Sequence, residues 1–300
     1  MKEVFIASAV RTPLGSFGGV FAKLSAIDLG TAAIKGALEK AGVPADQVQE
    51  VLMGNVVSAN LGQAPARQAA LGAGIGQHVP CTTVNKVCSS GMKAIMFGAQ
   101  SIMLGHNDLV VAGGMESMSQ APYLVKGARD GLRFGHKAFE DALLADGLWC
   151  AFEDWAMGNA AEFIAKQFEV TRAEMDEFAF NSHLKAAEAT ANGRFQAEIA
   201  PVVIKTRKGE TVVDTDEPIR ASFSGGGYEM QTSVDLLGRL RPAFVKEGQV
   251  TAGNAPGLND GGAAVVVTSR AEAERQGVAP MARIVGYTHA AVEPKWIFSA

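Results

Sequence analysis

The chain has 300 residues, of which 48% are hydrophobic and 19% are charged, and its formal net charge is −4. This composition is typical of a globular protein of about two domains, and it argues against a nucleic-acid partner, which usually needs a clustered basic surface. No apolar stretch approaches the roughly 18 residues that a membrane span needs, so no membrane partner is predicted either.

The cysteines of the chain are Cys81, Cys88 and Cys150. An odd number of cysteines at irregular spacing matches neither a disulfide framework nor a metal site, so no metal is predicted. Reduced thiols are typical of the cytosol, and we therefore expect a cytoplasmic location. The N-terminal apolar run, residues 4–10, is too short for a signal peptide and is predicted to be a buried strand.

Strands and helices are predicted to alternate in the first part of the chain. The predicted strands are 3–11, 51–53, 82–87 and 108–112, and the predicted helices are 26–42, 65–75 and 89–104. Apolar residues recur at helical spacing over 26–42, and Gly42 and Pro44 end that helix. Alternation of this kind indicates a layered α/β core.

The pattern changes over residues 120–249, which are richer in charged and aromatic residues. Helices are predicted there at 138–146, 155–168 and 172–192, and strands at 199–205 and 210–214. We interpret this segment as an insertion into the first domain, to which a buried strand at 265–268 returns the chain. Residues 282–294 repeat the layout of residues 2–13, which indicates that a second copy of the opening fold begins near residue 272.

The candidate for chemistry is Cys88, in the segment NKVCSSGMKA at residues 85–94. A predicted strand ends at Val87, and a predicted helix begins directly after Cys88. The unpaired N–H groups and the dipole at a helix start favour a thiolate, which is the nucleophilic form, and a free N–H there could stabilise an oxyanion. A buried cysteine at the start of a core helix is the structural alternative, because free cysteines are commonly buried.

The segment NKVCSSGMKAI, residues 85–95, resembles the nucleophile segment of the thiolases, especially of the acetyl-CoA acetyltransferase type. Further segments resemble thiolase segments in the same order, at residues 8–19, 51–75, 111–123 and 251–264. Several motifs in register are far more specific than one motif alone. The resemblance to the thiolase family therefore extends over almost the whole chain.

The resemblance implies a layered α/β/α thiolase-like fold with an inserted loop domain. It assigns residues 1–119 and 250–271 to an N-terminal thiolase domain that carries the nucleophile. Residues 120–249 are implied to be the loop domain that binds coenzyme A (CoA). Residues 272–300 are expected to be the start of an incomplete C-terminal thiolase domain, so that the second α/β repeat is largely missing.

The resemblance also implies a two-step mechanism in which Cys88 takes the acetyl group of acetyl-CoA as a thioester. A second cysteine then removes a methyl proton from another acetyl-CoA, and the carbanion attacks the acyl-enzyme to give acetoacetyl-CoA. The implied activity is that of an acetyl-CoA C-acetyltransferase, which catalyses this Claisen condensation or its reverse thiolysis. No prosthetic group is expected, since the CoA thioester enters as substrate. A homodimer or homotetramer is expected for the full-length family.

Family contacts to CoA fall at positions in or just after the loop domain. They are Leu148, Met157, Arg220, Phe244 and Ala252. Arg220 could pair with a phosphate or lie along the adenine, although a surface arginine in a charged loop is the alternative. The apolar residues could instead be plain core residues.

The sequence departs from the family pattern at several positions. Ala156 stands where the family often has His, Pro256 stands where it usually has Ser and removes an N–H, and residues 221–238 look longer and richer in Gly. Their effect on CoA binding is left open. The chain ends at Ala300, and the family segments that carry an oxyanion-hole Asn, the activating His and the base Cys have no match in it. We therefore expect a truncated thiolase with impaired activity.

Other functions stay open. A ketoacyl synthase or another condensing enzyme of the same fold also uses Cys at a helix start, although the segments GGMESMS and NAPGLNDG favour a thiolase. A non-catalytic acyl-CoA-binding remnant would bind CoA without becoming acylated at Cys88. A cysteine hydrolase fits less well, because no His or Asn motif supports it.

Overall fold

The structure is a computed structural model that describes residues 2–207 and 209–300. The chain divides into two compact units. Unit 1 comprises Met1–Leu143, Glu198–Glu217 and Asn259–Tyr287, and unit 2 comprises Leu144–Ala197, Pro218–Leu258 and Thr288–Ala300. These are units of packing, and the division into thiolase domains and a loop domain stays a prediction.

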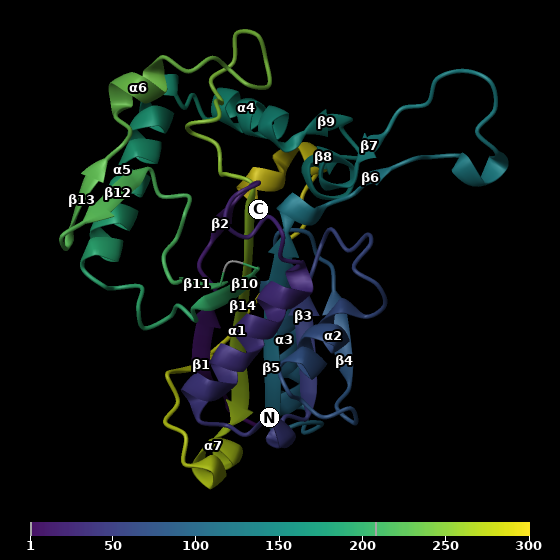
Figure 1. Cartoon of the computed structure of the whole chain (residues 1–300), viewed down its shortest axis with the longest axis vertical. Helices are drawn as coiled ribbons and strands as arrows, with labels where there is room; N and C mark the ends of the chain where they lie inside the picture. The colour runs from purple at the N-terminus through teal and green to yellow at the C-terminus, as the bar shows by residue number, and fades with distance from the viewer. Residues whose placement is uncertain (1, 208) are drawn as a thin grey trace. The chain divides into compact units, whose positions relative to one another are not determined.

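A mixed sheet forms the centre of unit 1. Its described strands are β1 (Val4–Arg11), β2 (Gly15–Ser16), β3 (Glu50–Gly54), β4 (Cys81–Val84), β5 (Leu109–Ser117), β14 (Asn259–Ser269) and β15 (Ala282–Arg283). Across the sheet they follow the order β15–β1–β14–β5–β3–β4, with β2 paired to the first two residues of β14 (Figure 1). Because β3 runs parallel to both β4 and β5, the carboxyl ends of these three strands lie at one edge of the sheet.

Helices cover both faces of this sheet. They are α1 (Ala26–Ala41), α2 (Pro65–Gly72) and α3 (Ser90–Met103). Alternate residues of a strand point to opposite faces, so Val51 and Met53 of β3 pack with α1 and α2, whereas Leu52 packs with α3. The arrangement confirms the predicted layered α/β class.

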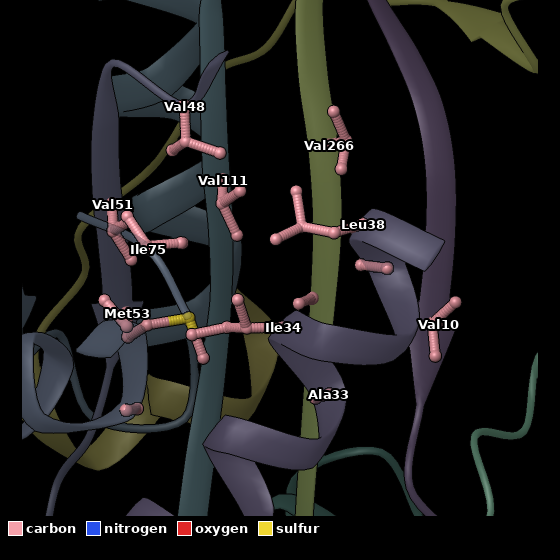
Figure 2. Close-up of a cluster of buried hydrophobic side chains, with 14 of the residues drawn as sticks. Val10, Ala33, Ile34, Leu38, Val48, Val51, Met53, Ile75, Val111 and Val266 are labelled. Carbon is pink, nitrogen blue, oxygen red and sulfur yellow. The ribbon is translucent and has the colours of Figure 1, made fainter. Parts of the chain in front are cut away.

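The larger apolar cluster lies between the sheet and the α1 face. In Figure 2, Ile34 and Leu38 of α1 lie beside Val111 of β5 and Val266 of β14. Ile34, Val111 and Val266 are fully buried. Burial of each such side chain contributes about 1.5–3 kcal/mol relative to exposure, so this cluster is the main support of unit 1.

Helix α1 confirms the prediction of a helix at 26–42. Residues next to each end fix where this helix begins and ends. At its start, the Ser25 hydroxyl accepts a hydrogen bond from the Asp28 N–H at 3.2 Å, and the Asp28 carboxylate accepts one from the Ser25 N–H at 2.8 Å. At its end, Gly42 adopts φ +66°, a conformation that glycine takes without strain.

The remaining short elements of unit 1 are β6 (Tyr123–Leu124), β7 (Glu140–Asp141), β10 (Val202–Thr206), β11 (Gly209–Val213), α7 (Arg270–Gln276) and 3-10 turns at Ala45–Gln47, Met118–Gln120 and Ala128–Asp130. Unit 2 contains β8 (Trp149–Cys150), β9 (Trp155–Ala156), α4 (Met157–Gln167), α5 (Arg172–Ala191), β12 (Ala221–Ser224), β13 (Gly227–Met230), α6 (Val234–Gly238) and a 3-10 helix at Pro294–Ser299. A π-helical turn spans Leu143–Leu148. Within unit 2, the Phe163 ring of α4 packs edge-on against Trp296, with the ring centroids 5.0 Å apart.

Some predicted elements differ from the structure. The predicted helix at 138–146 is wrong in its first part, because Glu140–Asp141 form β7, which pairs with β6. The Asp141 carboxylate then accepts a hydrogen bond from the Leu143 N–H at 2.9 Å, and residues from Leu143 to Leu148 form a π-helical turn instead of an α-helix. The predicted strand at 82–87 ends at Val84, since Val87 adopts φ +49° and cannot extend it.

Candidate active site

Cys88 lies in the loop between β4 and α3, at the edge of the sheet where β3, β4 and β5 end. Helix α3 begins at Ser90 with Ser89 as its N-cap residue, so the prediction that the helix begins directly after Cys88 is wrong by one residue. The Cys88 side chain is exposed, which rules out the alternative of a buried core cysteine.

Glycines bring the start of α3 against the ends of β3 and β5. A Cβ atom on Gly54 would lie 2.5 Å from the backbone N of Gly91 and 2.6 Å from the carbonyl carbon of Ser90. A Cβ atom on Gly114 would lie 3.3 Å from the Gly91 Cα. The backbone of the helix therefore rests directly on the backbone of the strands, which fixes where the Cys88 loop can lie.

Hydrogen bonds close the Cys88 loop on itself. The Val87 N–H donates to Oδ1 of Asn85 at 3.0 Å. The Ser90 hydroxyl accepts from the Lys86 N–H at 2.8 Å and donates to the Val87 carbonyl at 2.5 Å. These bonds hold Val87 at φ +49°, in the left-handed region.

A half-buried carboxylate supports the neighbouring turn after β3. Glu116 of β5 accepts hydrogen bonds from the Val56 N–H at 2.9 Å, from the Val57 N–H at 3.2 Å and from the Asn55 side-chain amide at 2.8 Å. Burial raises the pKa of the Glu116 carboxyl, and these bonds offset the rise only in part. Within the described chain, the buried Oδ1 of Asn55 has no hydrogen-bond partner.

The residues predicted to contact CoA all lie in unit 2, where they form two groups. In the first group, Leu148 and Met157 flank the β8–β9 pair, and both are half-buried. The Phe244 ring, 40% exposed, lies against Gly158 so closely that a Cβ atom there would overlap it. Leu148, Met157 and Phe244 are thus partly open to solvent within unit 2.

The second group joins Arg220 to Ala252. The Arg220 guanidinium donates to the Ala252 carbonyl at 3.1 Å, and Ala252 is exposed. The segment leading to Ala252 is held to α4 by Glu162, whose carboxylate accepts from the Gln249 and Val250 N–H groups at 2.8 Å. Because α4 begins at Met157, this helix connects the two groups within unit 2.

Comparison with known proteins identifies the family. A model described as "Thiolase, N-terminal domain" matches residues 4–271. The chain is 49% identical to an Acetyl-CoA acetyltransferase of Cupriavidus necator, over 98% of this chain and 73% of that protein. It is 48% identical to an Acetyl-CoA acetyltransferase of Pseudomonas aeruginosa over the same shares, and 48% identical to Acetyl-CoA acetyltransferase 2 of Arabidopsis thaliana over 100% and 72%. The chain belongs to the thiolase family.

The thiolase is therefore an acyltransferase, and the family and the enzyme class predicted from its segments are confirmed. The roles predicted for Cys88 and for the five residues in unit 2 stay predictions.

Two other cysteines of this thiolase lie outside the Cys88 loop. Cys81 lies at the start of β4 and is half-buried, and burial raises the pKa of its thiol. Its sulfur lies 3.4 Å from the Val79 carbonyl. Cys150 lies in β8 of unit 2.

Among the histidines of the thiolase, His183 of α5 has a defined contact in unit 2. Its Nδ1 accepts a hydrogen bond from the Arg220 N–H at 3.3 Å. Burial and the nearby Arg220 charge lower the pKa of His183. Arg220 lies 37 residues from His183 along the chain, so no local sequence pattern signals this contact.

Two of the departures from the family pattern, Ala156 and residues 221–238, lie in defined elements of unit 2. Ala156 ends β9 and immediately precedes α4. The Gly-rich stretch at 221–238 forms the β12–β13 hairpin and then α6, which the Ser233 hydroxyl caps by accepting from the Leu236 N–H. Gly225 and Gly226 supply the positive φ angles of the hairpin turn.

All three cysteines of the thiolase are free thiols. Among the described residues, no group of three or more His, Cys, Asp and Glu side chains is arranged to hold a metal ion. Over residues 2–207 and 209–300, none of the helices has the length and apolar character required to cross a membrane.

Proposed function

We propose that Cys88 is the acyl acceptor of this thiolase and that acetyl-CoA is its substrate. The observation that carries the proposal is an exposed thiol on a loop at the carboxyl ends of β3, β4 and β5. Ligands of open α/β sheets bind outside the carboxyl ends of the strands. The name acetyl-CoA acetyltransferase, which several relatives carry, supports acetyl as the group transferred.

In the first step, the Cys88 thiolate attacks the carbonyl carbon of acetyl-CoA. A C–S bond to Cys88 forms, the C–S bond to CoA breaks, and CoA leaves as a thiolate that takes up the proton released by Cys88. Helix α3 begins two residues after Cys88, and the partial positive charge at its start favours the negative charge that develops on the thioester oxygen.

In the second step, a base removes a proton from the methyl group of another acetyl-CoA. The carbanion attacks the thioester carbon on Cys88, a C–C bond forms, and Cys88 leaves as a thiolate while acetoacetyl-CoA is released. The family segments that carry the base Cys and the activating His have no match among these 300 residues. We therefore expect the 300 residues to acetylate Cys88 but to show little acetoacetyl-CoA thiolysis; substantial thiolysis that Cys88→Ser abolishes would contradict the expected impairment.

For CoA itself, we propose that Leu148, Met157 and Phe244 lie along the pantetheine arm. Their partly exposed apolar surfaces support this role. Arg220 would pair with a phosphate or lie along the adenine, and its bond to the Ala252 carbonyl orients the guanidinium for such a contact. The small Ala252 would allow the ligand to approach the backbone.

Release of CoA tests the proposal. On mixing with acetyl-CoA, we expect the wild-type chain to release one CoA per chain, Cys88→Ser to release none, and the matched control Cys150→Ser to behave as wild type. Binding of CoA without any release would contradict the catalytic role of Cys88 and would support a non-catalytic acyl-CoA-binding protein. Acylation by acyl carrier protein in preference to acetyl-CoA would instead support a ketoacyl synthase.

The homodimer or homotetramer and the assignment of residues 120–249 to CoA binding remain proposals by resemblance, and the cytoplasmic location remains a proposal from the cysteine content. Analytical ultracentrifugation of a full-length member of the family tests the first of these, and a single monomeric species at micromolar concentration would contradict it.

A further inference from the structure

The residue before the proposed nucleophile has an unfavourable backbone conformation. Val87 adopts φ +49°, where the Cβ atom of an L-residue crowds its own backbone, and β-branched residues are rarely found there. Its side chain is 47% exposed, so apolar packing alone does not hold it in place. The conformation must therefore be held largely by polar contacts of the loop.

Ser90 supplies the first of these contacts. Its hydroxyl accepts from the Lys86 N–H at 2.8 Å and donates to the Val87 carbonyl at 2.5 Å, so that one side chain holds two backbone groups on the N-terminal side of Cys88. Ser90 is only 4% exposed, and its own N–H donates to the same Val87 carbonyl at 3.0 Å. Little water can compete for these bonds.

Asn85 supplies the second contact and anchors the loop to the sheet. Its Oδ1 accepts from the Val87 N–H at 3.0 Å, and its side-chain amide donates to the Val56 carbonyl at 3.5 Å. Val56 is itself fixed, because its N–H donates to the half-buried Glu116 carboxylate at 2.9 Å. Both backbone groups of Val87 are thus held, one by Asn85 and one by Ser90.

We propose that Ser90 and Asn85 are positioning residues that form a clasp around Cys88, holding Val87 left-handed and thereby aiming the Cys88 thiol at the thioester. The inference rests on the proposed function of Cys88. Neither residue needs to touch the acyl group, because both act through the backbone of the loop. Misplacement of a reacting atom by about 1 Å can lower a rate about 100-fold. The orientation of the Cys88 thiol should therefore strongly affect the rate of acetylation.

The chain offers a matched pair of variants for the test. Ser90→Ala removes both hydroxyl bonds of the clasp. Ser89→Ala makes the same change one residue away, at an exposed serine whose hydroxyl, in the described chain, does not cap α3. The two readouts are acetylation of Cys88 by acetyl-CoA, which demands one approach direction, and alkylation by iodoacetamide, which a small electrophile achieves from many directions.

We expect Ser90→Ala to acetylate about 10–100-fold more slowly than wild type while its alkylation changes by less than about threefold. Ser89→Ala should match wild type in both reactions. A general loosening of the fold would change both reactions together, so the ratio of the two rates separates positioning from a merely structural role.

Two variants of Asn85 provide a second test in case Ser90→Ala folds poorly. Asn85→Ala removes the acceptor for the Val87 N–H, whereas Asn85→Asp keeps a carboxylate oxygen in its place. The ratio of acetylation to alkylation should fall in Asn85→Ala and recover in part in Asn85→Asp, which keeps the acceptor for the Val87 N–H but loses the donor to the Val56 carbonyl. Equal ratios in these two variants would contradict the role of Asn85.

The outcomes separate the clasp from the proposed function. If wild-type Cys88 is acetylated and Ser90→Ala keeps the wild-type ratio, the clasp is overturned and the function of Cys88 stands. If wild-type Cys88 is not acetylated, the proposed function fails, and hydrogen exchange over residues 85–92 decides on the clasp. Faster exchange in Ser90→Ala than in Ser89→Ala would support it, and equal exchange would overturn it.

Discussion

Val87 adopts φ +49° with its side chain 47% exposed, which makes it a site where a different residue should fit better. A left-handed conformation costs about 1–2 kcal/mol for most L-residues, and Asn tolerates it because its side chain bonds locally. We therefore expect Val87→Asn to raise the free energy of unfolding by about 0.5–1 kcal/mol, measured by urea denaturation.

The control for this prediction is Val203→Asn. Val203 is 46% exposed but lies in β10, where the backbone is extended and Asn has no advantage. A gain in stability at both positions, or at neither, would contradict the account of Val87.

Glu116 gives a prediction for the pH dependence of stability. Burial raises the pKa of its carboxyl above the ordinary value of 4.5, so the folded chain holds this proton more tightly than the unfolded chain does. The resulting stabilisation is complete below the unfolded pKa and is lost as the pH rises through the raised folded pKa. Glu116→Gln cannot titrate.

We therefore expect the Tm of wild type to fall relative to that of Glu116→Gln as the pH rises from about 4.5 toward neutrality. The variant should also be less stable in absolute terms by about 1–3 kcal/mol, because the Gln amide cannot accept from both Val56 and Val57 as the two carboxylate oxygens do. Parallel Tm curves over this pH range would show that Glu116 does not carry a raised pKa.

At the scale of elements, the contact between α3 and β3 depends on Gly54. A Cβ atom at Gly54 would lie 2.5 Å from the Gly91 backbone N, and backbone cannot move aside as a flexible side chain can. We expect Gly54→Ala to lower the free energy of unfolding by about 1–3 kcal/mol and to slow acetylation of Cys88, because the start of α3 must shift.

Gly91, on the opposite side of this contact, provides the control. A Cβ atom there would approach no closer than 3.5 Å to the Gly113 backbone, which is an ordinary contact, and Gly91 lies within α3. Gly91→Ala should leave stability unchanged or raise it by up to about 1 kcal/mol through helix propensity. If both alanine variants lost equal stability, the close approach at Gly54 would not be the cause.

In unit 2, the Phe244 ring rests on Gly158 at the start of α4. Gly158→Ala must push the ring aside, and a ring that is 40% exposed can move at little cost in stability. If Phe244 contacts the pantetheine arm, calorimetry should show CoA binding weakened about fivefold, or roughly 1 kcal/mol, with little change in Tm. Gly238→Ala, where a Cβ atom meets nothing within 4 Å, should bind CoA as wild type does; equal affinities in all three proteins would argue against this role for Phe244.

The sequence predicts well those helices whose ends are fixed by residues close to them in the chain. Helix α5 has a capping box in which Thr171 and Glu174 bond reciprocally, and helix α1 has the same device. The π-helical turn at Leu143–Leu148 escaped prediction because a two-residue strand pairing with β6 decides it.

The support of the Cys88 loop also escaped prediction. The position of the thiol followed from a strand meeting a helix, but Glu116 reaches Val56 across 60 residues of chain, and no local pattern signals that bond. The left-handed conformation of Val87 could not be predicted either, because β-branched residues such as valine rarely adopt a positive φ angle.

For the whole molecule, membership of the thiolase family and the acyltransferase class rest on the match to residues 4–271 and on relatives that are 48–49% identical. The chemistry proposed for this chain rests on one thiol. Cys88 is exposed at the sheet edge, whereas Cys81 and Cys150 are half-buried elsewhere in the fold.

Peptide mapping by mass spectrometry after incubation with acetyl-CoA tests this claim most directly. The account predicts that the acetyl group is found on the peptide that contains Cys88, that Cys81 and Cys150 remain free, and that Cys88→Ser acquires no acetyl group. An unmodified Cys88, or acetylation spread equally over the three cysteines, would contradict it.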